Sequence, residues 1–233
     1  MSPSNEFGQP IGASLGEWKP PPQPPARPLQ GRTVSLHPLD SGIHGAALHN
    51  ALADAPDSLW TYMTIGPFAD RGDLEAALVE MTDLADWLPY AILVDGEALG
   101  FACYLRIDPP HGVIEIGSIT FSPRLQRTTA ATEAIYLMIA NVFELGYRRC
   151  EWKCDDLNEP SRAAANRLGF TYEGTFRNAT HYKGRSRDTA WYSIVDREWP
   201  GLDKAFQRWL APANFDDRGR QRQSLHDVRE GNN

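Results

Sequence analysis

The chain lacks long hydrophobic runs, a secretory signal and an excess of positive charge. None of its 233 residues lies in a run of about 18 apolar residues, so no transmembrane helix is expected. The N-terminal sequence Met-Ser-Pro-Ser-Asn-Glu has no basic region followed by an apolar one, unlike a secretory signal. These absences predict a cytoplasmic protein with no membrane partner.

Charge and cysteine content argue against two further classes of protein. The formal net charge is −7, and nucleic-acid-binding proteins favour a basic face, so no nucleic acid partner is expected. Three cysteines are too few, and odd in number, for a disulfide framework. Cys150 and Cys154 share one face of an expected strand, and no second Cys or His pair has metal-ligand spacing. We therefore interpret them as core residues in preference to a zinc site, and expect no metal.

The most informative stretch joins a strand to a helix. Residues 113–121 are mostly apolar and β-branched or aromatic, which predicts a strand, and Ser122-Pro123 ends it because proline cannot continue a central ladder. From about Gln126, apolar residues recur at helical spacing up to Gly146. The start of such a helix exposes unpaired N–H groups with partial positive charge, and it binds anions, phosphates above all.

The rest of the chain alternates strands with helices. Asp95-Gly96 separates two apolar runs and predicts a hairpin. The expected strands are 33–37, 90–94, 99–106, 149–153, 170–176 and 188–195, and the expected helices are one capped by Asp40 or Ser41 that runs to about Ala53, then 73–87, 159–169 and 202–210.

Composition divides the chain into four parts. Residues 1–31 are rich in proline and poor in aliphatics, which predicts an extended arm, partly polyproline II. Such an arm either lies on the surface, is disordered, or binds a proline-reading partner. Residues 32–197 form the main domain, 198–213 an added helix, and 214–233 a polar, charge-rich tail that we expect to be disordered.

Three motifs follow one another from residue 126 onwards. Gln126-Arg-Thr-Thr-Ala-Ala131 begins the long helix, and Asp155-Asp-Leu-Asn158-Glu-Pro-Ser161 and Asn166-Arg-Leu-Gly169-Phe170 come after it. Their order and spacing resemble the GNAT N-acetyltransferase superfamily, in its RimJ/RimL-like branch, over residues 32–197. The resemblance implies a mixed α+β fold with a central, mostly antiparallel twisted sheet flanked by helices.

The same resemblance implies a function. Members transfer an acetyl group from acetyl-CoA to a primary amine, either a protein N-terminus or a small-molecule amine, by direct attack in a ternary complex. The family loop has glycine where this chain has Thr129, and a tyrosine that often protonates the departing thiolate is replaced by Ala165. These departures leave open a non-catalytic acyl-CoA-binding regulatory or interaction module. Superfamily members are often homodimers, in which the arm or the 202–210 helix would cover a neighbouring subunit.

The resemblance places coenzyme A at the strand–helix junction. The strand end would run along the pantetheine arm and offer a donor to the acyl carbonyl, the loop amides would bind the pyrophosphate, and Asn158 and Ser161 would reach the cofactor. Alternatively, Asn158 only caps its helix and Ser161 only lies in the first turn. The expected cofactor-binding residues are Ile119, Thr120, Phe121, Gln126, Arg127, Thr128, Thr129, Ala130, Ala131, Asn158 and Ser161.

Glu115 and Ser118 are the catalytic candidates on this strand. Family members often carry a carboxylate base at the position of Glu115, and partial desolvation among apolar neighbours would make it a better base. Its alternative is an outward residue that faces solvent or an arginine. Ser118, Tyr172 and Tyr182 carry hydroxyls for the acid, and the sequence places none of them.

Acceptor contacts are expected from the aromatic loop between the first two helices, which form one wall of the acceptor site in this family. Its candidates are Trp60, Tyr62 and Met63. Plain packing between the two helices is the alternative for these residues.

Overall fold

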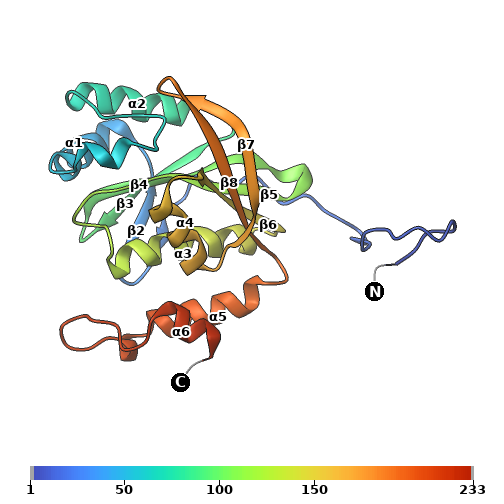
Figure 1. The fold of residues 1–233 in the computed structure, drawn as a ribbon. Coiled ribbons are helices and arrows are strands. Elements are labelled where there is room, and N and C mark those ends of the chain that lie inside the picture. Colours follow the sequence, from blue (N-terminus) through green and yellow to red (C-terminus); the bar gives the residue numbers. More distant parts are fainter. Residues whose placement is uncertain (1–2, 232–233) are drawn as a thin grey trace.

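Eight strands form one sheet in the computed structural model, which describes residues 3–231 (Figure 1). Their order is β1-β2-β3-β4-β5-β6-β8-β7, and every neighbouring pair is antiparallel except β5 and β6. The strands are β1 Leu29–Gln30, β2 Ser35–Pro38, β3 Leu88–Val94, β4 Glu97–Asp108, β5 Val113–Phe121, β6 Arg149–Asp155, β7 Thr171–Tyr182 and β8 Arg185–Val195. The mostly antiparallel sheet expected from the sequence is confirmed.

The β3–β4 hairpin has the turn that its sequence predicts. Asp95 (φ 50°) and Gly96 (φ 81°) both adopt the left-handed conformation, as a tight two-residue turn between antiparallel strands requires. After β4, Gly112 (φ 64°) turns the chain back into β5, and a side chain there would collide with Trp18 and Arg148. Strands β3, β4 and β5 therefore form a continuous meander.

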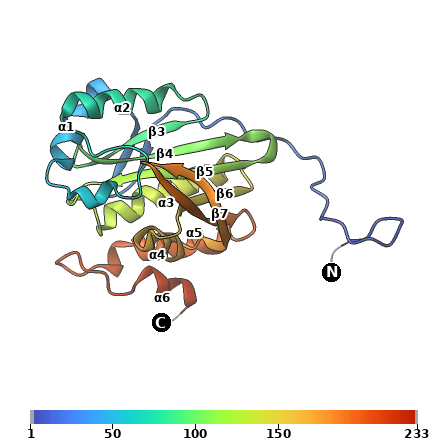
Figure 2. The same cartoon turned by 45° about the horizontal axis from the view of Figure 1, so that its top comes forward.

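Helices cover both faces of the sheet and form a further layer below it (Figures 1 and 2). They are α1 Ser41–Leu52, α2 Arg71–Asp83, α3 Thr129–Glu144, α4 Glu159–Leu168, α5 Trp199–Leu210 and α6 Leu225–Glu230. Helices α1 and α2 pack on β3 and β4, whereas α3 and α4 lie on the opposite face. Helices α5 and α6 pack on α3 and α4 from outside.

Strand alternation divides the apolar residues between two cores. On β4, Ala102 and Tyr104 enter the larger core under α3, while Phe101 and Cys103 enter the smaller core under α1 and α2. The Tyr104 hydroxyl donates to the backbone oxygen of Met138 in α3 (2.7 Å), so this buried polar group is satisfied. All three cysteines are free and buried, which confirms their interpretation as core residues.

Helices α2 and α5 have different bounds from those expected. Helix α2 ends at Asp83 rather than at Trp87, because the next residue is already extended. Helix α5 begins at Trp199, three residues before the expected start at Leu202. Pro200 lies in its first turn, where a missing amide hydrogen leaves no helical hydrogen bond unmade.

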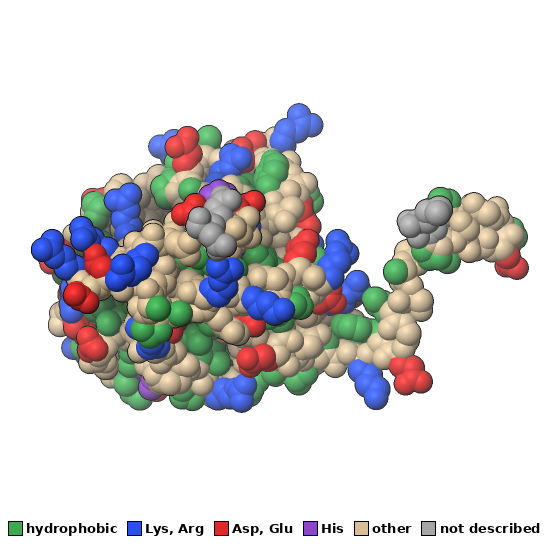
Figure 3. All heavy atoms as spheres, turned by 90° about the horizontal axis from the view of Figure 1, so that it is seen from below, with side chains coloured by type: hydrophobic (Ala, Val, Ile, Leu, Met, Phe, Trp, Pro, Cys, Tyr) green, Lys and Arg blue, Asp and Glu red, His purple; other side chains and the backbone are tan. Residues whose placement is uncertain are grey.

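The Pro-rich segment lies on the body of the protein. The Tyr147 hydroxyl donates to the backbone oxygen of Pro22 (3.1 Å), and the indole nitrogen of Trp18 donates to that of Pro110 (3.3 Å). Strand β1 follows and pairs with β2, so the sheet begins before the expected domain boundary at residue 32. The N-terminal end of the described chain extends away from the body (Figures 1, 2 and 3).

The expectation of a disordered tail over 214–233 is wrong for the described part of it. Helix α6 forms there, and Ser224 and Asp227 make a reciprocal capping box at its start. Leu225 and Val228 are buried in the larger core. Two apolar residues on one face are enough to dock this short helix, because α4 and α5 cover them.

The first two and last two residues, parts of the expected arm and tail, lie outside the described residues. Among residues 3–231, no helix is both long enough and apolar enough to cross a bilayer.

We expect Leu225→Ala to lower the free energy of unfolding by about 2–3 kcal/mol, because it removes a buried side chain from the contact of α6 with the core. The matched control is Leu157→Ala: Leu157 is 73% exposed, and its truncation should change stability by less than about 0.5 kcal/mol. Urea unfolding measures both variants. If the two are equally stable, α6 does not dock in solution.

Candidate functional site

Strands β5 and β6 are neighbours only at their start. Their parallel register joins residues 113–115 to residues 149–151, and within the described chain it goes no further. Beyond this point β5 continues beside β4, and β6 continues beside β8. We call this place, where β5 and β6 stop pairing, the divergence. Helices α3 and α4 follow these two strands, and the carboxyl ends of parallel strands with helices after them are a common place for ligands.

A β-bulge shapes β5 beside the divergence. On the two sides of the bulge, Gly117 pairs with Cys103 of β4 and Thr120 pairs with Phe101. Three steps along β5 thus correspond to two along β4, so β5 contains one extra residue. Ser118 has a left-handed backbone (φ 48°), which is uncommon for a residue with a side chain. The bulge leaves backbone groups of β5 outside the ladder, where a ligand could use them.

The loop before α3 presents free amides. Arg127 adopts the left-handed conformation (φ 62°), and the Thr128 hydroxyl caps α3 by accepting from Ala131 N (3.1 Å). The amides of Arg127, Thr129 and Ala130 have no hydrogen-bond partner within residues 3–231. Free amides at the start of a helix, next to a left-handed residue, form an anion-binding concavity.

Two details of this loop differ from the expectation. Helix α3 begins at Thr129 rather than near Gln126, because left-handed Arg127 cannot continue a right-handed helix. Thr129, which replaces the glycine of the family loop, is the first residue of the right-handed helix, so the replacement causes no left-handed strain there. Ala131 is buried in the core, and the Gln126 amide donates to the backbone oxygen of Phe121 (2.9 Å), which joins the loop to the strand end.

The end of β5 carries the other expected cofactor residues of this strand. Ile119 and Phe121 are half-buried against the larger core, and Thr120 is fully buried. The hydroxyls of Thr120 and Ser122 are buried without a hydrogen-bond partner among the described residues. Buried hydroxyls are usually satisfied, so these two leave hydrogen-bonding capacity beside the divergence for a ligand or an ordered water.

Asn158 and Ser161 lie at the start of α4, on the β6 side of the divergence. The Asn158 side chain accepts from Ser161 N (3.2 Å), which confirms its capping role. The Ser161 hydroxyl accepts from the Trp152 indole nitrogen (3.0 Å). Both side chains are half-buried, and their contact with a cofactor stays a prediction.

Charged side chains lie on the face of β5 and β6 that is turned away from α3. Alternation along β6 sends Cys150 and Trp152 into the larger core, so Glu151 and Lys153 point to the opposite face. The Lys153 ammonium lies 2.7 Å from Glu151 Oε2 and 3.8 Å from the centre of the Trp191 ring on β8. We call this surface, formed by β5, β6 and β8, the charged face.

Glu115 on β5 belongs to the same network. Its Oε2 lies 2.6 Å from Arg106 Nη1 and 3.0 Å from Lys153 Nζ, and the residue is 3% exposed. The expected desolvation of Glu115 is therefore confirmed, and so is the alternative of a contact with an arginine. The two ion pairs hold the Glu115 carboxylate in place. A role for Glu115 as a base stays a prediction.

The three expected acceptor contacts differ in position. Trp60 is 5% exposed and packs edge-to-face on Phe68 in the smaller core, with ring centres 5.1 Å apart, which favours a packing role. Met63 is half-buried against the same core. Tyr62 is half-buried and lies close enough to Tyr182 to contribute to the raised pKa of that hydroxyl.

The β7–β8 hairpin reaches over to the aromatic loop. Both strands run beyond the expected ends at Phe176 and Asp188 to a turn at Lys183-Gly184. The Lys183 ammonium donates to the backbone oxygens of Trp60 (2.8 Å) and Ile65 (3.3 Å). The hairpin tip and the α1–α2 connection, far apart in sequence, therefore meet beside the charged face (Figure 1).

Sequence reasoning missed Asp155 as a functional residue, and it named the Tyr182 hydroxyl without placing it. Asp155 is the last residue of β6, is 5% exposed, and accepts a hydrogen bond from the Tyr182 hydroxyl (2.8 Å). Burial, followed by this hydrogen bond, raises the pKa of Tyr182 to about 12. Strand alternation could have identified Asp155, because it places this side chain opposite Cys154 and on the same side of the strand as Glu151. No local signal extends β7 as far as Tyr182.

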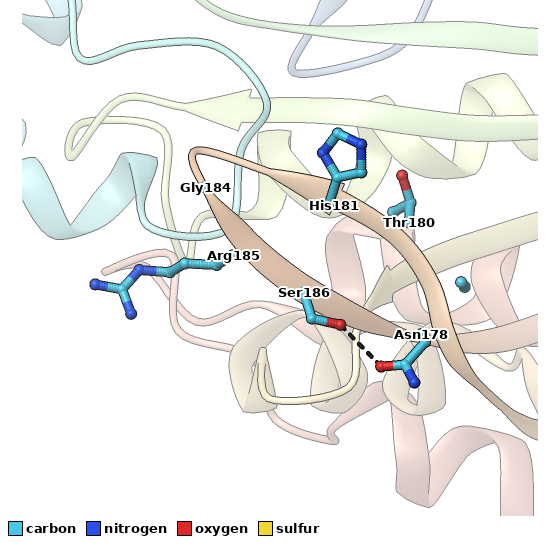
Figure 4. A pocket seen from close by; sticks show the side chains of 7 residues that line it. Asn178, Thr180, His181, Gly184, Arg185 and Ser186 are labelled. Atoms are coloured by element: carbon cyan, nitrogen blue, oxygen red, sulfur yellow. Dashed lines mark hydrogen bonds between the residues drawn. The ribbon is translucent and has the colours of Figure 1, made fainter.

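An open hollow lies on the hairpin itself (Figure 4). The Ser186 hydroxyl donates to Asn178 Oδ1 (2.9 Å) across it. Its lining residues are Asn178, Ala179, Thr180, His181, Gly184, Arg185 and Ser186. These residues are exposed, and none of them borders the divergence, so we place the candidate site at the divergence and the charged face instead.

Comparison with known proteins gives a consistent result. Residues 55–170 match the Acetyltransferase (GNAT) family. The protein named "Putative ribosomal N-acetyltransferase YdaF" from Bacillus subtilis (strain 168) is 30% identical over 156 residues, which cover 64% of this chain and 77% of that protein. A GCN5-related N-acetyltransferase from Brucella melitensis, solved by crystallography, has a TM-score of 0.90 at 44% identity, covering 93% of this chain and 100% of that chain.

A more distant structure shares the fold. It is the acetyltransferase from Salmonella typhimurium that modifies the N-terminal serine of the 50S ribosomal subunit protein L7/L12. Its TM-score is 0.63 at 21% identity, over 71% of this chain and 96% of that chain. The expected likeness to RimL-like enzymes is thus present at the level of the fold.

Glu115→Gln should lower the free energy of unfolding by about 1–3 kcal/mol, because it leaves two cations of the network with one carboxylate fewer. The control Glu97→Gln breaks an exposed ion pair with Arg124 and should leave the unfolding midpoint unchanged. Urea unfolding of both variants is the measurement. Wild-type stability of Glu115→Gln would mean that the network does not hold these strands together.

Proposed function

Because the chain belongs to the GNAT acetyltransferase family, we propose that it transfers an acetyl group from acetyl-CoA, the donor that this family uses, to a primary amine. The amine attacks the thioester directly while both substrates are bound. The observation that carries the proposal is the divergence of β5 and β6 beside the starts of α3 and α4. This arrangement offers N–H donors both for phosphates and for an acyl carbonyl.

Backbone groups bind most of the cofactor in this proposal. The pyrophosphate accepts from the free amides of Arg127, Thr129 and Ala130, and the partial positive charge at the start of α3 adds to the attraction. The pantetheine arm then follows β5 towards the bulge. Asn158 and Ser161 lie on the other side of the divergence, where their polar atoms are within reach of the same arm.

The acyl carbonyl lies at the bulge, where an amide of β5 outside the ladder donates to its oxygen as negative charge develops there. The Ser118 hydroxyl, at the same bulge, is the candidate proton donor to the departing thiolate. A covalent cysteine intermediate is disfavoured. Burial raises the pKa of all three cysteine thiols above its ordinary value, so little thiolate exists to attack the thioester.

The acceptor amine approaches from the charged face. Buried carboxylates at Glu115, Glu151 and Asp155 suit a cationic amine better than an anionic acceptor. The acceptor is a protein N-terminus or a small-molecule amine. The name of the Bacillus subtilis relative, a ribosomal N-acetyltransferase, supports the first of these.

The proposal is tested by incubating the full chain with acetyl-CoA and a panel of amines, including short peptides with free N-termini, and measuring the free thiol that is released. Thiol release that depends on an amine, with acetylated amine found by mass spectrometry, supports the transferase. CoA binding without thiol release for any amine would contradict it and favour a non-catalytic acyl-CoA-binding module.

Thr129→Glu should weaken CoA binding at least about tenfold while leaving the melting temperature unchanged or raised. A carboxylate in the first turn of α3 interacts well with the helix but repels phosphates at the same place. Thr129→Gln is the matched uncharged control, and it should bind CoA more tightly than Thr129→Glu. Calorimetric titration with CoA compares them. Equal affinities would place the phosphates away from this helix start.

A further inference from the structure

Asp155 is a buried carboxylate that forms no ion pair with another residue of the described chain. Four acidic residues in the described chain are buried: Glu115, Glu133, Glu151 and Asp155. Glu115 and Glu151 each form two ion pairs, and Glu133 accepts from two backbone amides and from the Thr33 hydroxyl. Asp155 has no ion pair within residues 3–231. A buried charge that forms no ion pair is costly, which suggests that a ligand supplies the paired cation.

The contacts of Asp155 leave room for such a ligand. Oδ1 accepts from Leu157 N (2.9 Å), and Oδ2 accepts from the Tyr182 hydroxyl (2.8 Å). A carboxylate accepts about four hydrogen bonds in all, so each oxygen retains the capacity for one more. The two existing bonds fix the orientation of the carboxylate, and neither neutralises its charge.

Strand register places Asp155 opposite the acyl site. The last pair between β5 and β6 is Glu115 with Glu151. Four residues further along each strand, about 13 Å from that pair, come Ile119 on β5 and Asp155 on β6. Ile119 adjoins the bulge at which the acyl carbonyl is proposed to lie. Asp155 is therefore the acidic residue of β6 at the level of the thioester, whereas Glu115 and Glu151 lie where the strands still pair.

We propose that Asp155 binds the acceptor ammonium at the divergence and takes its proton before the attack on acetyl-CoA, and that Tyr182 positions it. This inference rests on the acetyl transfer proposed above. It assigns to Asp155 the proton transfer that the sequence suggested for Glu115, whose carboxylate is held between Arg106 and Lys153. The role left to Glu115 is to hold Lys153 in place on the charged face through their ion pair.

The proton balance is as follows. An alkyl ammonium transfers one proton to a carboxylate oxygen of Asp155 and becomes a neutral amine. The nitrogen lone pair forms a bond to the acetyl carbon, and the carbon–sulfur bond breaks with its electron pair on sulfur. The Ser118 hydroxyl gives its proton to the thiolate, and the second amine proton, lost as the amide forms, restores that hydroxyl. The products are the acetylated amine and CoA. Asp155 releases its proton to solvent before the next turnover.

Other polar groups surround Asp155 and bear on its titration. Tyr182 of β7 donates to it, and Tyr62 of the aromatic loop lies near that hydroxyl. Arg187 of β8 and Arg162 of α4 are the nearby cations, and both also act on the neighbouring Cys154 thiol. Arg162 is already paired with Asp156 and with the Tyr192 hydroxyl.

Two buried donors lie on the same face of β8. Thr189 is the register partner of Asp155, and Arg187 and Trp191 stand two residues to either side of it. Arg187 Nε and Trp191 Nε1 are buried and have no hydrogen-bond partner in the described chain. Buried donors are usually satisfied, so these two favour an acceptor that carries a carbonyl or another hydrogen-bond acceptor close to its amine.

The test is the pH dependence of acetyl transfer by the full chain and by Asp155→Asn. The amide oxygen can still accept from Leu157 N, and the amide NH2 then faces the Tyr182 hydroxyl, which accepts from it instead of donating. The amide cannot take a proton from the amine. We expect kcat at pH 7 to fall at least about tenfold and to recover as pH rises and the free amine becomes abundant, with the Kd of CoA changed less than about twofold. The matched control is Asp156→Asn, the next carboxylate along the chain, whose partners are Arg162 and Thr175. It should keep the wild-type profile.

A second variant separates a positioning role from a purely structural one. Tyr182→Phe removes a donor that stabilises the ionised Asp155, so the acid limb of the kcat/KM profile should move to higher pH. An unmoved limb, a wild-type profile for Asp155→Asn, or an equal loss in Asp156→Asn would each overturn the assignment to Asp155 while leaving the transferase intact. Absence of thiol release by the wild type with every amine would overturn the proposed function, and this assignment with it.

Discussion

Parallel pairing between β5 and β6 ends after three residues, although both strands continue well beyond that point. Each strand keeps its other neighbour, β4 or β8, so the sheet remains continuous while its centre opens at one end. Backbone groups inside a protein are costly to leave unpaired, so an interrupted ladder is retained where a ligand makes use of it. Helices α3 and α4 both start at this end and direct free amides and capped turns towards it. The proposed positions of cofactor, acyl group and acceptor all follow from this interruption.

Burial of charge on the other face of the same strands complements that arrangement. The network of Glu115, Glu151 and Lys153 replaces the apolar packing that α1 and α2 provide on β3 and β4. A buried ion-pair network is seldom more stable than apolar packing, so its presence favours a functional reason for a polar surface. Lys183 at the hairpin tip then ties the far side of this surface to the aromatic loop. The binding surfaces proposed for the two substrates thus lie on the same strands.

The sequence predicts the elements whose signals are local. The Asp95-Gly96 turn, the strand over residues 113–121 and the Asn158 cap each depend on a few adjacent residues, and each is present. Features that depend on distant partners could not be predicted. Helix α6 forms because α4 and α5 cover two of its side chains, and Asp155 is held by Tyr182, which is 27 residues away. The left-handed backbone of Arg127 was not predicted either, because the family pattern has its glycine at position 129 and not at position 127.

The central claim is that CoA lies at the divergence with its phosphates on the start of α3. The most direct test is a titration of the isotope-labelled protein with CoA, followed by the nuclear magnetic resonance shifts of assigned backbone amides. We predict the largest shifts at Arg127, Thr129 and Ala130, with further shifts along residues 118–121 of β5. Shifts confined to the hairpin hollow at residues 178–186, with none at the start of α3, would contradict this placement.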